Sequence, residues 1–199
     1  MVGRICLDEI YRFGNVPVKL GNTLCWDFLS LFQNVKQSIY LAVKKGYDLQ
    51  GLAVDTWGVD FGLIDRAGRL LSNPVCYRDS RTQGVSQKAE AIISKRDMYA
   101  ITGIQQMEIN TVFQLLSMKE QNAQTLAIGD GLLFIPDLIN FYLTGNVYNE
   151  YTIASTSQLV NAKTRTWEKS LFDKLNLPLY LFKNIIKPCS LVGNLTDDI

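Results

Sequence analysis

Short apolar runs that read as strands alternate with longer segments of helical periodicity, and this alternation limits the possible folds of the chain. Strands are predicted at 5–13 and 51–55, and a hairpin is predicted over 59–77 with its turn at "RAG". From 83 to 120 the pattern is mostly helical. Strands alternating with helices predict the α/β class, and 199 residues suffice for one domain or one lobe of a larger protein.

The first helix is predicted over 28–45. Asp27 precedes it as the predicted N-cap, and the helix is predicted to end before Gly46. Spacings of three and four residues predict one apolar face made of Leu29, Phe32, Val35, Ile39 and Ala42 or Val43.

Three more helix ends are marked by capping residues. A helical segment closes on Gly103, and Asn110 precedes the next helix as a cap. A third helix begins near Pro136 and Asp137 and ends at Gly145, since proline favours the first turn and glycine the position after the last.

The overall charge and hydropathy exclude two classes of partner. The formal net charge is +1, and the basic residues are scattered, which argues against a nucleic-acid binder. No apolar run approaches the roughly 20 residues that span a bilayer. The first residues carry charges instead of a signal peptide, so a cytoplasmic location is expected.

The chain has four cysteines and no histidine. Cys6, Cys25, Cys76 and Cys189 form no CxxC pair, so free and mostly buried thiols are expected and no metal site is predicted. Without histidine, acid–base chemistry would fall to carboxylates, tyrosine or lysine. Neither GxxxxGK[ST] nor GxGxxG occurs, so the chain's own motifs predict no nucleotide site.

The first candidate site follows the strand predicted at 51–55. Asp55, Thr56, Trp57 and Gly58 either form a turn that closes a core strand or line a ligand crevice at the strand's carboxyl end. In the second case Gly58 lets a substrate approach the backbone, because it has no Cβ. Periodicity alone leaves both interpretations open.

The second candidate site is "YRDSRT", which contains Tyr77, Arg78, Asp79 and Arg81. Its charges could form an ion-pair staple between a turn and a helix. They could equally bind a polyol, with the ring beneath the C–H face of a sugar. In "NEYTIASTS", Glu150 and the hydroxyl residues could line a polar cleft, but caps and turns are the favoured interpretation.

Four segments together resemble a known family: "DTWGVDFGLID", "PVCYRDSRT", "IPDLINFYLTG" and "NEYTIASTSQLVN". Their order and spacing are similar to those of the rhamnulokinases, which belong to the FGGY family of carbohydrate kinases. The resemblance implies a ribonuclease-H-like (actin-like) lobe with a mixed sheet flanked by helices. Residues 1–199 would form a single domain, most of the N-terminal sugar-binding lobe, without its phosphate hairpin.

The resemblance also implies an activity and a set of site residues. Such enzymes transfer the γ-phosphoryl group of ATP, with Mg²⁺, to the 1-hydroxyl of L-rhamnulose in rhamnose catabolism. Gly58 matches a substrate-contacting position, and Tyr77 matches an aromatic beside the substrate. The remaining implied contacts are Asp55, Thr56 and Trp57, with Arg78 and Asp79 as weaker candidates.

The departures from the family pattern limit what the chain is expected to do alone. The catalytic aspartate is expected beyond the C-terminus, because Asp197 and Asp198 lack its motif, and the ATP-binding lobe is absent. No catalytic, cofactor-binding or metal residue is therefore assigned, and the chain alone is expected to be inactive. Two alternatives stay open: a kinase for another ketose such as fuculose or xylulose, and a non-catalytic binding module.

Overall fold

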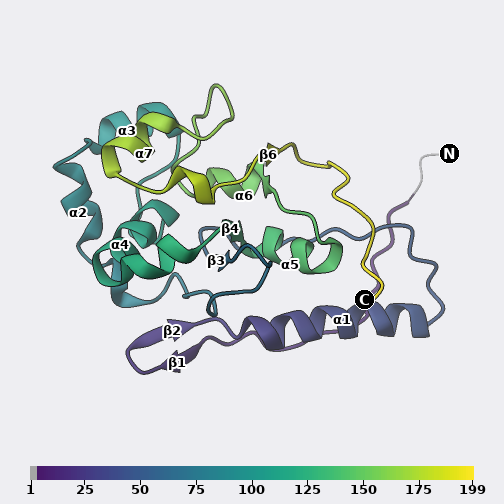
Figure 1. Cartoon of the computed structure of the whole chain (residues 1–199). Coiled ribbons are helices and arrows are strands. Elements are labelled where there is room, and N and C mark those ends of the chain that lie inside the picture. The colour runs from purple at the N-terminus through teal and green to yellow at the C-terminus, as the bar shows by residue number, and fades with distance from the viewer. Residues whose placement is uncertain (1–3) are drawn as a thin grey trace.

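The computed structural model describes residues 4–199, in which helices and short strands alternate as the α/β class requires (Figure 1). The strands are β1 (Val18–Leu20), β2 (Thr23–Cys25), β3 (Phe61–Ile64), β4 (Gly131–Phe134), β5 (Asn149–Glu150) and β6 (Ile185–Ile186). The α-helices are α1 (Phe28–Lys44), α2 (Val85–Glu90), α3 (Lys95–Thr102), α4 (Thr111–Ile128), α5 (Ile135–Thr144), α6 (Tyr151–Ser155) and α7 (Lys169–Leu175). Two 3-10 helices are η1 (Ser80–Thr82) and η2 (Leu179–Leu181).

The strands pair in both directions. β1 with β2 and β3 with β4 are antiparallel, whereas β5 with β6 is parallel. A parallel bridge between Leu132 and Phe182 links β4 to the C-terminal part of the chain. The mixed pairing confirms the predicted class, although these strands form three two-stranded sheets.

β3 and β4 lie in the middle of the molecule, between two hydrophobic clusters. Phe61 and Leu63 pack into one cluster with residues of α2, α3, α4, α6 and α7. Ile64 and Leu133 pack into the other with α1 and α5. Successive side chains of a strand point to opposite faces, so a strand buried on both faces must be apolar throughout, as these are.

Helix α1 begins where the sequence predicts. The Asp27 carboxylate accepts a hydrogen bond from the backbone N of Ser30 at 3.1 Å, as an N-cap should. Leu29 was expected on the buried face but is 73% exposed. Consecutive residues lie about 100° apart around a helix, and Phe28 occupies the buried face instead. The side chains that face the core are Phe28, Leu31 and Ala42, with Phe32, Val35 and Ile39 partly buried.

The other predicted helix ends are confirmed, with one difference in capping. Gly103 and Gly145 both adopt left-handed backbone conformations after α3 and α5. Asn110 precedes α4 but makes no cap hydrogen bond. Its amide donates instead to Gln158 Oε1 and to Gln105 O, both at 2.9 Å, and so ties α4 to more distant segments.

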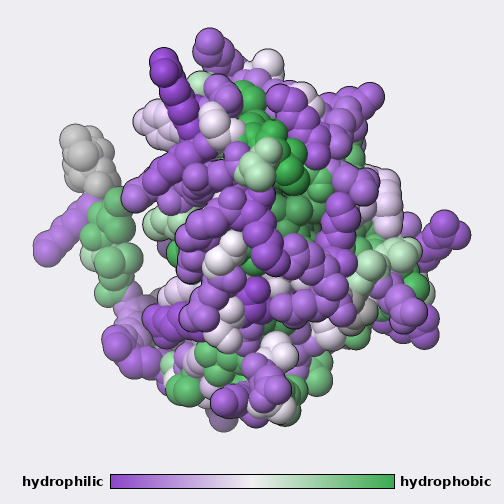
Figure 2. Space-filling view, turned by 90° about the vertical axis from the view of Figure 1, so that its left-hand side faces the viewer, coloured by the Kyte–Doolittle hydropathy of each residue, from purple (hydrophilic) through white to green (hydrophobic). Residues whose placement is uncertain are grey.

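The segments 5–13 and 51–55 are not strands, contrary to the prediction. Within residues 4–199, neither makes a backbone–backbone hydrogen bond, so their strand-like patterns find no partner strand. Ile5 and Leu7 are 87% and 96% exposed, and hydrophobic residues next to the grey N-terminus stand clear of the body in Figure 2. A cavity of about 450 Å³ adjoins the second segment, and most of its lining is aliphatic or aromatic: Phe13, Leu31, Val35, Ile39, Leu52, Val54, Trp57 and Ile139.

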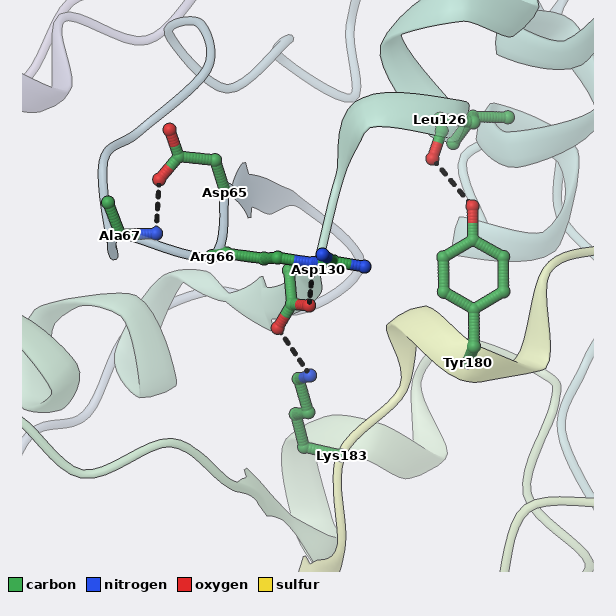
Figure 3. A network of polar contacts seen from close by, with 7 residues as sticks. All are labelled: Asp65, Arg66, Ala67, Leu126, Asp130, Tyr180 and Lys183. Atoms are coloured by element: carbon green, nitrogen blue, oxygen red, sulfur yellow. Dashed lines mark hydrogen bonds and ion pairs between the residues drawn. The ribbon is translucent and has the colours of Figure 1, made fainter.

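The hairpin predicted over 59–77 is reduced to a turn. The bridge between Ile64 and Leu70 and the hydrogen bonds beside it are all that pair its arms, because the returning arm then leaves β3 and Val75 pairs with Cys25 of β2. Beyond this end of β3, Asp130 accepts a hydrogen bond from Lys183 Nζ at 3.2 Å, with Arg66 Nε 3.7 Å from its other oxygen (Figure 3). These contacts fasten the C-terminal part of the chain to the central strands.

The four cysteines are free, as predicted. Cys25 and Cys76 are buried, whereas Cys6 and Cys189 are exposed, so the expectation of mostly buried thiols holds for two of them. Among residues 4–199 no helix is both long and apolar enough to cross a membrane.

Candidate functional site

A buried carboxylate, Asp60, joins the two segments that the sequence singles out. Its Oδ2 accepts hydrogen bonds from Trp26 Nε1 at 2.6 Å, from Trp57 Nε1 at 3.0 Å and from the backbone N of Tyr77 at 3.1 Å. Its Oδ1 accepts a hydrogen bond from Gln114 Nε2 at 3.1 Å. Asp60 is 0% exposed. The tertiary structure therefore brings "DTWG" and "YRDSRT" to one point.

These contacts suit an ionised carboxylate, since all four partners are N–H donors. Burial raises the pKa of Asp60 above its usual value, and the hydrogen bonds oppose this shift. A cation reaches this network through Gln114: Arg81 Nη2 donates to Gln114 Oε1 at 2.7 Å, and Gln114 in turn donates to Asp60. The hydrogen bonds to Asp60, together with the Arg81 guanidinium on the far side of Gln114, thus compensate the buried negative charge.

Aromatic rings surround the carboxylate. The ring centroids of Trp26 and Trp57 are 4.5 Å apart, and those of Trp26 and Tyr77 are 6.4 Å apart. The Arg78 guanidinium lies 5.1 Å from the Tyr77 ring centroid. Trp26 is buried, whereas Trp57 and Tyr77 are partly exposed. Such half-exposed rings provide the kind of surface on which the C–H face of a sugar can lie.

The backbone next to Asp60 is strained. Val59 has φ +67°, a left-handed conformation that is rare for a β-branched residue and costs about 1–3 kcal/mol. Its N donates to Thr156 Oγ1 at 3.0 Å. Its carbonyl accepts from Thr111 Oγ1 at 2.7 Å and from Gln114 Nε2 at 3.2 Å. Three side chains from distant segments thus hold this peptide in place.

Gly58 lies against Thr156. A Cβ at Gly58 would come within 2.9 Å of Thr156 Cγ2 and 3.2 Å of its Oγ1. Close packing between these two segments therefore already requires glycine here. Substrate approach to the backbone at Gly58 stays a prediction.

Asp55 and Thr56 come directly before Trp57 in the chain. Asp55 is exposed, and Thr56 Oγ1 donates to the carbonyl of Trp57 at 3.2 Å. Both line the cavity of about 450 Å³, together with Trp57. The mostly apolar lining of that cavity suits a polyol poorly.

Asp79 has a structural use. Its Oδ2 accepts a hydrogen bond from the backbone N of Leu24 at 2.7 Å, and its Oδ1 accepts one from the backbone N of Arg81 at 2.9 Å. The staple interpretation therefore describes Asp79, although hydrogen bonds to the backbone form it instead of an ion pair. Arg78 is exposed beside Tyr77 and is not part of this staple.

Most polar side chains of the hydroxyl-rich segment after β5 form helix caps and turns, which is the interpretation that the sequence favours. Glu150 Oε2 accepts hydrogen bonds from the backbone N of Thr152 at 2.9 Å and of Ile153 at 3.1 Å, which caps α6. Ser155 Oγ donates to the carbonyl of Thr152 at 2.7 Å. Thr156 has an additional use, because it holds the strained peptide at Val59.

Four residues of this site were given no role in it from the sequence: Trp26, Asp60, Thr111 and Gln114. An aspartate directly before a run as apolar as "FGLI" is one available signal, because a carboxylate at that place needs internal donors. Gln114 stands among apolar residues in "TVFQLL", which is a second signal. No local pattern shows that these residues meet.

No residue of this chain is assigned to a nucleotide or a metal ion. Within residues 4–199 no group of three or more histidine, cysteine, aspartate or glutamate side chains is placed to hold a metal ion. The buried carboxylate of Asp60 accepts its four hydrogen bonds from protein donors.

Comparison with solved structures defines the fold. A xylulose kinase from Lactobacillus acidophilus superposes with a TM-score of 0.82 over 94% of this chain and 38% of its own, at 20% sequence identity. A glycerol kinase from Plasmodium falciparum superposes with a TM-score of 0.80 over 94% of this chain and 40% of its own, at 18% identity. The fold is therefore that of one lobe of the carbohydrate kinases.

Sequence comparison identifies the family. The model of the "FGGY family of carbohydrate kinases, N-terminal domain" matches residues 18–199, so this chain belongs to that family. A rhamnulokinase from Oceanobacillus iheyensis is 40% identical over 99% of this chain and 42% of its own length. A rhamnulokinase from Bacteroides thetaiotaomicron is 36% identical over 99% of this chain and 41% of its own length. The chain thus spans about two-fifths of the length of these relatives.

Proposed function

We propose that this chain is most of the sugar-binding lobe of a rhamnulokinase-type kinase and that its ligand is L-rhamnulose. The observation that carries the proposal is the convergence of Trp57 and Tyr77 on Asp60 in a chain 40% identical to a rhamnulokinase. Two partly exposed rings with a guanidinium beside them present the apolar and polar groups that a ketose needs.

The proposal gives the site residues separate roles. Trp57 and Tyr77 form the apolar wall for the sugar, and Arg78 provides donors for its hydroxyls. Gly58 keeps the wall close to α6. Asp55 and Thr56 shape the cavity side, and Asp79 acts by holding the turn that carries Tyr77.

The reaction of the whole enzyme is part of the same proposal. The sugar 1-hydroxyl oxygen attacks the γ-phosphorus of ATP, the bond from that phosphorus to the oxygen of ADP breaks, and the hydroxyl proton passes to a base. We assign neither the base nor the sites for ATP and Mg²⁺ to residues of this chain, so the chain alone should show no turnover. A cytoplasmic site of action completes the proposal.

The binding step is tested by calorimetric titration of the purified chain with L-rhamnulose, L-fuculose and D-xylulose. We expect weak binding that favours L-rhamnulose, and we expect Tyr77→Ala to abolish it. Asp65→Asn is the matched control, because Asp65 organises a turn at the other end of β3. Equal binding by the Tyr77→Ala variant would remove Tyr77 from the wall.

The catalytic step is tested on a protein of the relatives' full length that contains this chain. With ATP and Mg²⁺ it should phosphorylate L-rhamnulose faster than the other ketoses. If L-fuculose or D-xylulose is the better substrate, the sugar is misassigned. If no ketose is phosphorylated, the kinase proposal fails, and the alternative of a non-catalytic binding module gains support.

A further inference from the structure

Asp60 accepts hydrogen bonds from four separate parts of the chain. Trp26 lies between β2 and α1, Trp57 precedes β3, Tyr77 precedes η1, and Gln114 lies on α4. A buried carboxylate of this kind fixes the mutual positions of its donors, because each unpaired group would remain buried at a cost.

We infer that Asp60 is the positioning residue of the sugar wall: it holds the Trp57 ring and the Tyr77 backbone in one arrangement before a sugar binds. The inference rests on the proposed function for the identity of the ligand. Asp60 has no exposed surface, so it acts through its donors and does not touch the sugar.

The hydrogen-bond pattern explains why a carboxylate is needed here. An asparagine at this position would direct its amino group either at the three donors on the Oδ2 side or at Gln114 Nε2. Gln114 cannot relieve this conflict by rotating its amide, since its Oε1 already accepts from Arg81 Nη2 at 2.7 Å. Asparagine therefore points its NH₂ group at another N–H donor in either orientation of its amide.

The strained peptide at Val59 is a second and independent observation. Val59 stands between Gly58 and Asp60 in a left-handed conformation, held by Thr111 and Thr156. A turn without strain would connect the segments at lower cost, so the structure maintains one particular backbone path between Trp57 and Asp60. Strain of this kind concentrates at ligand sites.

The positioning role can be tested on this chain by NMR of the ¹⁵N-labelled indole groups. The chain has three tryptophans, and Trp167 donates to the carbonyl of Lys183 at 2.7 Å, away from Asp60. In Asp60→Asn we expect the Nε1–H signals of Trp26 and Trp57 to shift and that of Trp57 to broaden, while that of Trp167 stays. An unchanged Trp57 signal in the folded variant would overturn the inference.

An acid titration of the unsubstituted chain covers the case in which Asp60→Asn does not fold. The indole signals of Trp26 and Trp57 should move with one common midpoint as Asp60 takes up its proton, and Trp167 should not follow. The charged or titratable groups that interact with Asp60 are Arg81 and the Cys76 thiol, and neither changes charge in acid. Independent midpoints for the two indoles would contradict a shared carboxylate.

The functional arm measures L-rhamnulose affinity. We expect Asp60→Asn to weaken this affinity by about tenfold or more, because a small displacement of the residues that contact a ligand is enough to lower affinity. Asp65→Asn should leave the affinity unchanged.

In a Trp57→Phe background the loss of affinity from Asp60→Asn should be much smaller, because the indole through which Asp60 acts is gone. A full loss in that background would show a general structural role instead. If the unsubstituted chain binds no ketose, the sugar proposal fails, and the indole signals still decide whether Asp60 positions Trp57.

Discussion

Trp26 Nε1 donates to Asp60 Oδ2 at 2.6 Å, across 34 positions of sequence. This bond connects the start of α1 to the start of β3, and the ring centroids of Trp26 and Trp57 lie 4.5 Å apart with the rings tilted by 47°. The half-exposed Trp57 ring therefore packs against the buried Trp26 ring and donates a hydrogen bond to the buried carboxylate of Asp60. The predictions below concern the residues that hold this arrangement and the core around it.

Gly58→Ala should destabilise the fold by about 1–3 kcal/mol, because the new Cβ would meet Thr156 Cγ2 at 2.9 Å. Thr156→Ser removes that methyl group and keeps the hydroxyl that binds Val59 N, so the double variant should recover much of the loss. Urea unfolding of the four proteins measures this coupling. Equal losses from Gly58→Ala in both backgrounds would show that Thr156 is not the obstacle.

Thr111→Val should lower the free energy of unfolding by about 1–2 kcal/mol, because the Val59 carbonyl loses its 2.7 Å hydrogen bond in a buried site. Thr125→Val on the same helix is the control with equal helix propensity, and it should change stability little because Thr125 is partly exposed. Chemical denaturation compares the two variants. A similar loss in both would point to the helix and not to Val59.

Asp27→Ala should cost about 1 kcal/mol of stability, because the backbone N of Ser30 loses its cap at the start of α1. Asp27→Asn should retain most of it, since an asparagine side chain caps as well as aspartate does. Thermal unfolding of both variants is the measurement. If both lose equally, the charge and not the cap would be responsible.

Asp137 should make the fold less stable as pH rises from about 4 to about 7. Burial raises the pKa of Asp137 to about 7, although Asn149 and the backbone N of Glu150 donate to it. The native state therefore keeps a proton that the unfolded chain has released, and the free energy of unfolding falls by up to about 4 kcal/mol over this range. Tyr148 and Glu150 are the neighbouring titratable groups, and burial raises the pKa of Tyr148 to about 12, outside this range.

Asp137→Asn should flatten this part of the pH profile, measured by urea unfolding at several pH values. Asp65→Asn is the control with the opposite shift: hydrogen bonds from Arg69 lower the pKa of Asp65, so it titrates below this range. The Asp65→Asn profile should therefore keep the unsubstituted slope between about pH 5 and pH 7. An unchanged slope in Asp137→Asn would show that Asp137 is ionised at neutral pH.

Local signals predicted the helices well. The cap at Asp27 and the glycines after α3 and α5 act through the backbone of their own turn, so a short window of sequence contains the information. Strands were predicted less well. The segments 5–13 and 51–55 have strand-like patterns, yet a strand exists only where a neighbour accepts and donates its hydrogen bonds.

The same difference explains the candidate site. Sequence pattern identified Trp57 and Tyr77 but could not relate them, because they meet through a third residue. For Asp79 the sequence left a staple and a ligand-binding role both open, and in the structure its two oxygens accept hydrogen bonds from the backbone N–H groups of Leu24 and Arg81. Whether a polar side chain is free to bind a ligand depends on which donors the fold brings to it.

By itself the sequence determined the α/β class and the helix ends at Asp27, Gly103 and Gly145, and it singled out the two segments around Trp57 and Tyr77, since periodicity, capping and residue type are properties of short stretches. Only the tertiary structure decided that β3 pairs with β4, that Gly58 packs on Thr156, and that Asp60 gathers donors from four parts of the chain. Pairing and burial of this kind depend on residues distant in sequence, whose proximity is set by packing of the whole core.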